Sequence, residues 1–293
     1  MSGTAARQAR RAEALGATLP PLLVAAQRVA ATVAQGVHGR RRVGQGDSFW
    51  QYRPFAPGDA PGRIDGRASA KSDRSFIRET EWEAAQSVFL WRDASASMDW
   101  RSGAALPHKR ERAELLLLAL ASLLLRGGER VRLIGGPPRL RGGRFALEDL
   151  AEGVATLQHE ADMPHTVPLP RHARVILIGD MLAPIDTIRQ TVSAMAATPV
   201  AGYLLQVLDP AETLLPYTGR VRFQGLEQES DALVPRVEGI KQAYGAALAA
   251  HQAGLARLCA TFGWGYATHQ TDHPPESALL AAYMALSGAL SAR

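Results

Sequence analysis

The decisive stretch of this sequence is Val88-Phe89-Leu90-Trp91-Arg92-Asp93-Ala94-Ser95-Ala96-Ser97. The apolar run 88–91 is typical of a buried strand, and an Asp-x-Ser-x-Ser turn follows it. One carboxylate and two hydroxyls are hard oxygen ligands of the kind that Mg2+ prefers. Ligands of open α/β sheets bind outside the carboxyl ends of strands. The turn is therefore a candidate metal site, and it indicates adhesion rather than catalysis.

Downstream of this turn, apolar runs typical of strands alternate with helical patterns. We expect helices at 109–126, 150–157, 184–196, 237–262 and 277–290, and strands at 131–134, 175–178, 200–208 and 265–269. A short antiparallel return is predicted at 144–147. Strands separated by helices favour an α/β fold with a doubly wound, mostly parallel sheet and helices on both faces.

The chain is predicted to divide near residue 83. Residues 1–83 have a helical pattern over 4–35, turn signals over 43–75 and a short strand pattern at 76–78, so we interpret them as an extension. Residues 84–290 carry the α/β pattern and form the second predicted domain.

Composition limits the classes of protein to which this chain can belong. Its 293 residues, 46% of them hydrophobic, are enough for a sizeable core. The single cysteine, Cys259, excludes an intrachain disulfide and fits a reducing cytoplasm, where we expect it to be a packed core thiol. No signal peptide pattern is visible, and the longest apolar run, 115–125, is shorter than the roughly 18 residues of a membrane span. We therefore expect a cytoplasmic protein with no membrane span.

Basic residues concentrate at the N-terminus. Residues 1–78 hold 12 Arg and 1 Lys against 5 acids, a net charge of +8, whereas residues 79–293 hold 20 basic residues and 23 acids, a net of −3. This excess could bind nucleic acid or an acidic protein surface. A solvated surface is the interpretation we favour, because no aromatic residues interleave with the arginines as in known binding motifs.

Several spaced motifs together resemble a known family. They are Gly44-x-Gly46, Phe49, the block 53–65 with Arg53, Phe55, Pro57-Gly58-Asp59 and Arg63-Ile64-Asp65, then Arg78-Glu79, Asp93-x-Ser95-x-Ser97-Met98, the segment 207–212 and the helix 244–251. This combination resembles the bacterial domain of unknown function 58 family, whose C-terminal half is von Willebrand factor A-like. The resemblance implies an adaptor or assembly protein that works beside a MoxR-type AAA+ ATPase. Ser48, Phe55 and Gly66 depart from the family pattern, which has Glu, Tyr and Trp at these positions.

The resemblance also implies a metal-ion-dependent adhesion site. Ser95 and Ser97 would bind Mg2+ directly, with Mn2+ or Ca2+ as alternatives, and Asp93 would bind it directly or through water. Asp180, which ends the strand 175–178, would be the acid of a further loop, and Thr166 is the candidate for the usual Thr. An open coordination position would then accept a carboxylate of a partner protein. The alternative is that Asp93 and the two serines only hydrogen-bond a tight turn.

The block 53–65, which we call the Pro-Gly-Asp block, is a second candidate surface. Arg53, Asp59, Arg63 and Asp65 could bind a partner protein. We favour the alternative that they form an internal network of salt bridges and turns.

Known catalytic patterns are missing from the sequence. There is no Gly-x-Ser-x-Gly elbow, no Walker loop and no zinc spacing among the histidines. We therefore expect a protein that is not an enzyme. A Mg2+-dependent hydrolase that uses Asp93 and Asp180 is the second hypothesis, but it lacks an obvious general base. Nucleic-acid binding through the arginine-rich segment is the third, and salt sensitivity would test it.

Overall fold

The structure is a computed structural model that describes residues 43–56, 59, 64–70, 74–81, 86–143, 145–157, 162–226 and 230–288. These residues belong to two compact units, one within residues 37–85 and one that begins at residue 86. The helix predicted over residues 4–35 lies outside the described residues.

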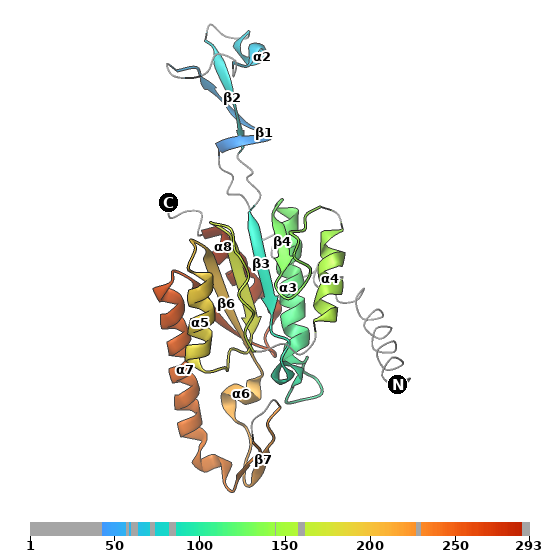
Figure 1. The fold of residues 1–293 in the computed structure, drawn as a ribbon, viewed down its shortest axis with the longest axis vertical. Helices are drawn as coiled ribbons and strands as arrows, with labels where there is room; N and C mark the ends of the chain where they lie inside the picture. Colours follow the sequence, from blue (N-terminus) through green and yellow to red (C-terminus); the bar gives the residue numbers. More distant parts are fainter. Residues whose placement is uncertain are drawn as a thin grey trace, which may run out of the picture. The chain divides into compact units, whose positions relative to one another are not determined.

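The larger unit contains a five-stranded parallel sheet in the order β4-β3-β5-β6-β9 (Figure 1). The strands are β3 (Ser87–Arg92), β4 (Arg130–Leu133), β5 (Arg174–Gly179), β6 (Ala201–Leu208) and β9 (Gly265–Gln270). The chain runs from β3 outward to β4 and then returns to place β5 on the other side of β3. The winding direction therefore reverses between β3 and β5, which is the switch point of a doubly wound sheet. This confirms the predicted α/β fold class.

Helices cover both faces of the sheet. They are α3 (Lys109–Arg126), α4 (Ala146–Thr156), α5 (Ile185–Met195), α7 (Lys241–Thr261) and α8 (Pro275–Gly288). On one face α3 and α8 contact each other and the strands, with α4 beside α3, and on the other face α5 contacts α7. Side chains alternate between the two faces along each strand.

The hydrophobic core follows this alternation. On β3, Phe89 and Trp91 belong to the cluster that contains Ile188 of α5 and Leu255 of α7. The same cluster includes Cys259, whose thiol is buried, as predicted. Burial raises the pKa of this thiol to about 11, so the thiolate is scarce at neutral pH.

The apolar run 115–125 forms the C-terminal part of α3. All residues from Leu116 to Leu124 are buried. The sheet lies on one side of this helix, and α4 and α8 contact its other sides. A helix that is enclosed in this way is apolar around most of its circumference.

One prediction about the larger unit was wrong, and one segment had no predicted element. The antiparallel return at 144–147 is instead a single bridge between Arg141 and Val131, because Gly143 turns the chain at a φ of 81° and α4 begins at Ala146. Between β6 and α7 the sequence analysis placed nothing. The structure has a short helix there, α6 (Pro210–Leu214), and a hairpin of β7 (Val221–Phe223) and β8 (Ala232–Val234).

The smaller unit contains more regular structure than its turn signals predicted. β1 (Val43–Pro54) pairs antiparallel with β2 (Phe76–Glu81), and a short helix, α2 (Gly66–Ser69), lies between them in the chain. The register shifts between Gly44 and Phe49, so the glycines occupy an irregular part of the ladder. An irregularity of this kind allows glycines inside a long strand.

None of the helices in the described part of the chain is long and apolar enough to cross a membrane.

Candidate functional site

The Asp-x-Ser-x-Ser turn lies directly at the carboxyl end of β3. The backbone N–H of Asp93 still donates to the carbonyl of Ile178 at 2.8 Å, so the turn begins while β3 remains paired with β5. The Ser95 N–H then donates to Asp93 Oδ1 at 2.8 Å. This bond closes an Asx turn, and a 3-10 helix, η2 (Ala96–Asp99), follows.

Asp180 meets this turn from the end of β5. Ser97 Oγ donates to Asp180 Oδ2 at 2.6 Å, and the hydroxyls of Ser95 and Ser97 are 3.1 Å apart. The structure therefore brings four of the predicted ligands, Asp93, Ser95, Ser97 and Asp180, together at the switch point. We call these four residues the oxygen cluster.

Thr166, the fifth predicted ligand, has a different environment. It lies in the connection from α4 to β5, and its side chain is exposed. No hydrogen bond joins it to the oxygen cluster within the described residues. The geometry therefore gives no support to Thr166 as a ligand.

Only one of the two carboxylate oxygens of Asp93 has a hydrogen-bond partner among the described residues. The residue is 1% exposed, and its Oδ2 has no hydrogen-bond partner among the residues that the structure describes. A Cβ atom on Gly179 would lie 2.7 Å from Asp93 Cβ and 2.9 Å from Oδ2, so only glycine leaves room for this side chain. Burial, and after it the charge of Asp180, raises the pKa of Asp93 to about 7. A cation nearby would stabilise its charged form.

Lys109 supplies a cation that the sequence analysis missed. Its Nζ donates to Asp180 Oδ2 at 2.9 Å and to Glu212 Oε1 at 2.6 Å, and its side chain is 1% exposed. Burial alone lowers the pKa of Lys109, but the carboxylates of Asp180 and Glu212 outweigh this effect and raise it above the ordinary value. The side chain is therefore an ammonium ion that contacts the oxygen cluster.

Glu212 and Asp209 hold the loop beside Lys109. Asp209 caps α6, since its Oδ1 accepts from the Ala211 N–H at 2.8 Å, and its Oδ2 accepts from the Ser102 N–H at 2.9 Å. Glu212 Oε2 accepts in turn from the Asp209 N–H at 2.8 Å. This capping box fixes the Glu212 carboxylate, whose other oxygen accepts from Lys109.

A buried ion pair anchors the start of the turn to the neighbouring helices. Arg92 Nη2 lies 3.1 Å from Glu114 Oε1 of α3, and the same guanidinium donates to the carbonyls of Asp93 and Val154, each at 3.0 Å. These bonds tie the end of β3 to α3 and to α4. They position the turn that carries Asp93, Ser95 and Ser97.

The oxygen cluster fits a Mg2+ ion only in part. Its donors are of the right chemical type, and Asp93 Oδ2 is available as a ligand. However, Asp180 Oδ2 already accepts from Ser97 and from the Lys109 ammonium. The described residues also contain no group of three or more His, Cys, Asp or Glu side chains that could hold a metal ion. As arranged, the site does not fit a Mg2+ ion bound by all four cluster residues, and metal binding stays a prediction.

The Pro-Gly-Asp block has the geometry of an internal network. Arg53 binds Asp59 through two hydrogen bonds of 2.6 Å each, and Asp59 Oδ2 also accepts from the Ala56 N–H at 2.8 Å. Asp65 Oδ1 accepts from the Arg67 N–H at 3.0 Å. Arg63 lies outside the described residues. Partner binding by this block stays a prediction.

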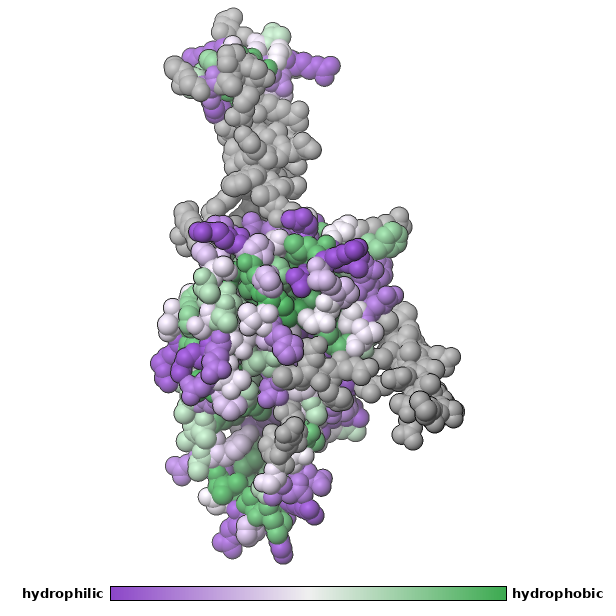
Figure 2. All heavy atoms as spheres, viewed as in Figure 1, coloured by the Kyte–Doolittle hydropathy of each residue, from purple (hydrophilic) through white to green (hydrophobic). Residues whose placement is uncertain are grey.

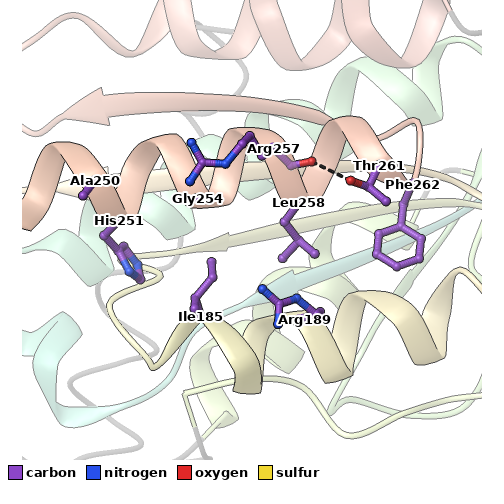
Figure 3. Close-up of a pocket in the computed structure, with 9 residues that line it drawn as sticks. All are labelled: Ile185, Arg189, Ala250, His251, Gly254, Arg257, Leu258, Thr261 and Phe262. Carbon is purple, nitrogen blue, oxygen red and sulfur yellow. Dashed lines mark hydrogen bonds between the residues drawn. The ribbon is translucent and has the colours of Figure 1, made fainter.

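A pocket of about 390 Å³ lies between α5 and α7 (Figure 3). Apolar side chains and two arginines line it, and His251 at one end hydrogen-bonds the carbonyl of Met181 at 2.6 Å. The Arg189 side chain, which lines the pocket, is paired with Asp186. Met181 follows Asp180 in the chain, so the pocket is connected to the oxygen cluster through one backbone segment.

Comparison with known proteins gives the chain its family. Residues 51–254 match the model of a family described as "Protein of unknown function DUF58". Uncharacterized proteins of Mycobacterium bovis and Mycobacterium tuberculosis are 26% identical to the chain over 256 residues, which is 82% of this chain and 80% of each relative.

Two solved structures are more distant. A conserved hypothetical protein, BatB, from Bacteroides thetaiotaomicron is 16% identical, with a TM-score of 0.43 over 71% of this chain and all of the other. An aerotolerance-related membrane protein from Bacteroides fragilis is 14% identical, with a TM-score of 0.37 over 70% of this chain and all of the other. Because the family model covers well over half of the sequence, this chain belongs to the DUF58 family.

Proposed function

We propose that this protein is a non-enzymatic adaptor that binds a partner protein at the carboxyl edge of its parallel sheet. The observation that carries the proposal is a group of exposed apolar side chains on α6, the β7–β8 hairpin and the start of α7. This group, which we call the apolar rim, consists of Leu214, Leu226, Leu233 and Ile240, exposed by 66%, 48%, 52% and 39%. Figure 2 shows apolar residues at the end of the larger unit where α6 and β7 lie in Figure 1. Contiguous apolar surface is typical of protein interaction sites, and α6 and α7, which carry or adjoin two of these residues, contact each other.

The apolar rim is tied to the oxygen cluster through α6. Glu212, which binds Lys109, precedes Leu214 by two residues on this helix. The Tyr244 hydroxyl of α7 donates to the Glu212 carbonyl at 2.6 Å, which joins α6 to α7. A partner on the apolar rim would therefore contact elements that also support the oxygen cluster.

The family resemblance favours a MoxR-type AAA+ ATPase as the partner, with the complex acting in the cytoplasm to assemble or activate a client. The site chemistry favours binding over hydrolysis. Asp93 and Asp180 are 1% and 4% exposed, so a substrate has little access to them, and Lys109 is held by two carboxylates. A general base must reach its substrate within hydrogen-bond distance.

The test is a binding assay with a purified MoxR-type ATPase encoded in the same genome. We expect Leu214→Asp and Leu233→Asp to weaken binding at least about tenfold, because each puts a charge into an apolar contact. Leu280→Asp on α8, where the side chain is 40% exposed, is the matched control and should bind like the wild type. Equal affinity of all four proteins would refute the proposed surface.

The metal-assisted form of the proposal needs a separate measurement. Partner affinity is compared with and without Mg2+, for the wild type and for Asp93→Ala. A gain in affinity with Mg2+ that Asp93→Ala abolishes would support metal-assisted docking. Affinity that is independent of Mg2+ in both proteins would leave protein binding intact but remove the metal from it.

A further inference from the structure

We infer that the Lys109 ammonium is the resident cation of this site, in place of a divalent metal ion, and that it makes the oxygen cluster select against such ions. The inference decides between the two forms of the proposed function, on which its biological use rests, in favour of the form without a metal ion. Its evidence lies in the contacts of one side chain. Lys109 donates to Asp180 at 2.9 Å and to Glu212 at 2.6 Å. Asp180 follows β5 and Glu212 lies on α6, so the ammonium joins two separate segments at the carboxyl edge of the sheet. A bridging metal ion would make the same kind of connection.

The Lys109 ammonium and the Ser97 hydroxyl share one carboxylate oxygen. Asp180 Oδ2 accepts from Lys109 Nζ and also from Ser97 Oγ. A metal ion that used Asp180 Oδ2 and Ser97 Oγ as ligands would have to displace the Ser97 hydrogen bond and would lie close to the ammonium. The two cations would repel each other strongly, because a buried site screens charge poorly.

The Lys109 ammonium is enclosed by the fold and cannot move into water by a change of side-chain rotamer alone. Its side chain is 1% exposed, and it is the first residue of α3, where its backbone N–H donates to the Trp100 carbonyl at 3.2 Å. To move the ammonium into water, the start of α3 would have to open. The cation is therefore built into the fold, whereas a metal ion would come and go with its concentration.

Removal of this charge should convert the site into a metal site. Lys109→Met keeps an unbranched side chain of similar length and leaves Asp180 and Glu212 without their cation, next to the unpaired Oδ2 of Asp93. Among the described residues, the carboxylates of Asp93, Asp180 and Glu212 are not grouped around one point as they stand. Without the lysine charge between them, we expect Asp180 and Glu212 to shift and to bind Mg2+ or Mn2+, which prefer such oxygen ligands. The variant should bind these ions, and the wild type should not.

The experiment is a calorimetric titration with MgCl2 and with MnCl2, accompanied by thermal unfolding at each ion concentration. The proteins are the wild type, Lys109→Met and Lys241→Met, which makes the same substitution at an exposed lysine of α7. We expect saturable binding in Lys109→Met that is at least about tenfold tighter than in the other two proteins, together with a rise in Tm on adding metal.

Two results would overturn the inference. One is saturable Mg2+ or Mn2+ binding by the wild type that Ser95→Ala/Ser97→Ala abolishes, which needs no lysine variant. The other is a folded Lys109→Met protein that binds no metal, with Lys109→Gln as the second variant if the first does not fold. Neither readout involves a partner protein. The inference about Lys109 can therefore fail while the adaptor proposal holds, and the adaptor proposal can fail while the inference holds.

Discussion

Replacement of Lys109 by Met is expected to lower the free energy of unfolding by about 3 kcal/mol in the absence of metal. The substitution removes two charge-assisted hydrogen bonds, of 2.9 and 2.6 Å, each worth roughly 1.5–3 kcal/mol. Breaking a buried ion pair by removing one partner costs about 3–5 kcal/mol. The lower end applies here, because the Glu212 side chain is 16% exposed and keeps some contact with water. The buried Met side chain offsets a further part of the loss.

The assay is urea unfolding followed by tryptophan fluorescence. Lys241→Met is the control, and it should stay within about 0.5 kcal/mol of the wild type because its side chain is exposed. Adding Asp180→Asn and Glu212→Gln to Lys109→Met should recover more than half of the loss, since neutral amides do not need a cation. A Lys109→Met protein within about 1 kcal/mol of the wild type, or no recovery in the triple variant, would show that the buried charge of Lys109 does not stabilise the fold as described.

Two further predictions concern the stability of the larger unit. Gly179→Ala should destabilise it by about 2 kcal/mol or more in urea unfolding, because the added methyl group meets Asp93 at 2.7 Å, whereas Gly245→Ala in α7 meets nothing within 4 Å and should be neutral or stabilising. Equal behaviour of the two alanine variants would contradict this packing argument. Burial, and after it the positive charge of Arg112, lowers the pKa of His269 to about 4 in the folded protein. The imidazole therefore binds a proton more readily in the unfolded chain than in the folded protein. Stability should therefore fall as the pH drops from about 6.5 to 4, and His269→Leu, measured by unfolding at several pH values, should reduce this fall by up to about 3 kcal/mol. An unchanged pH profile would show that His269 does not titrate as described.

Much of the oxygen cluster could be predicted because the sheet is parallel and doubly wound. Asp93 and Asp180 each follow an apolar run that had to be a buried strand. Once both strands are neighbours in one parallel sheet, their carboxyl ends lie side by side and the two acids meet. Local sequence identified the two strands and their acids, and the topology of the parallel sheet then placed the two acids next to each other.

Lys109 could not be assigned from local sequence. It begins a helix whose first turn is charged, next to His108 and Arg110, and charged residues at such a position usually face water. Its partner Glu212 is 103 residues away, and their contact depends on how α3 and α6 pack at the same edge of the sheet. The rarity of lysine in this chain, with only three, was the one available signal.

The missed strands have two different causes. β7 and β8 contain three residues each, which is too short for an alternating pattern to stand out. β1 is long, but Gly44 and Gly46 lie in it and were interpreted as turn signals. The pairing with β2 tolerates them because the ladder is irregular at this point.

The role of Lys109 as the resident cation is tested most directly by a crystal structure of the wild-type protein soaked in MnCl2, with anomalous diffraction to locate the ion. We expect no anomalous peak at the oxygen cluster and a Lys109 ammonium within hydrogen-bond distance of Asp180 and Glu212, as in the present structure. A peak bound by Ser95, Ser97 and Asp180, with Lys109 displaced, would contradict it.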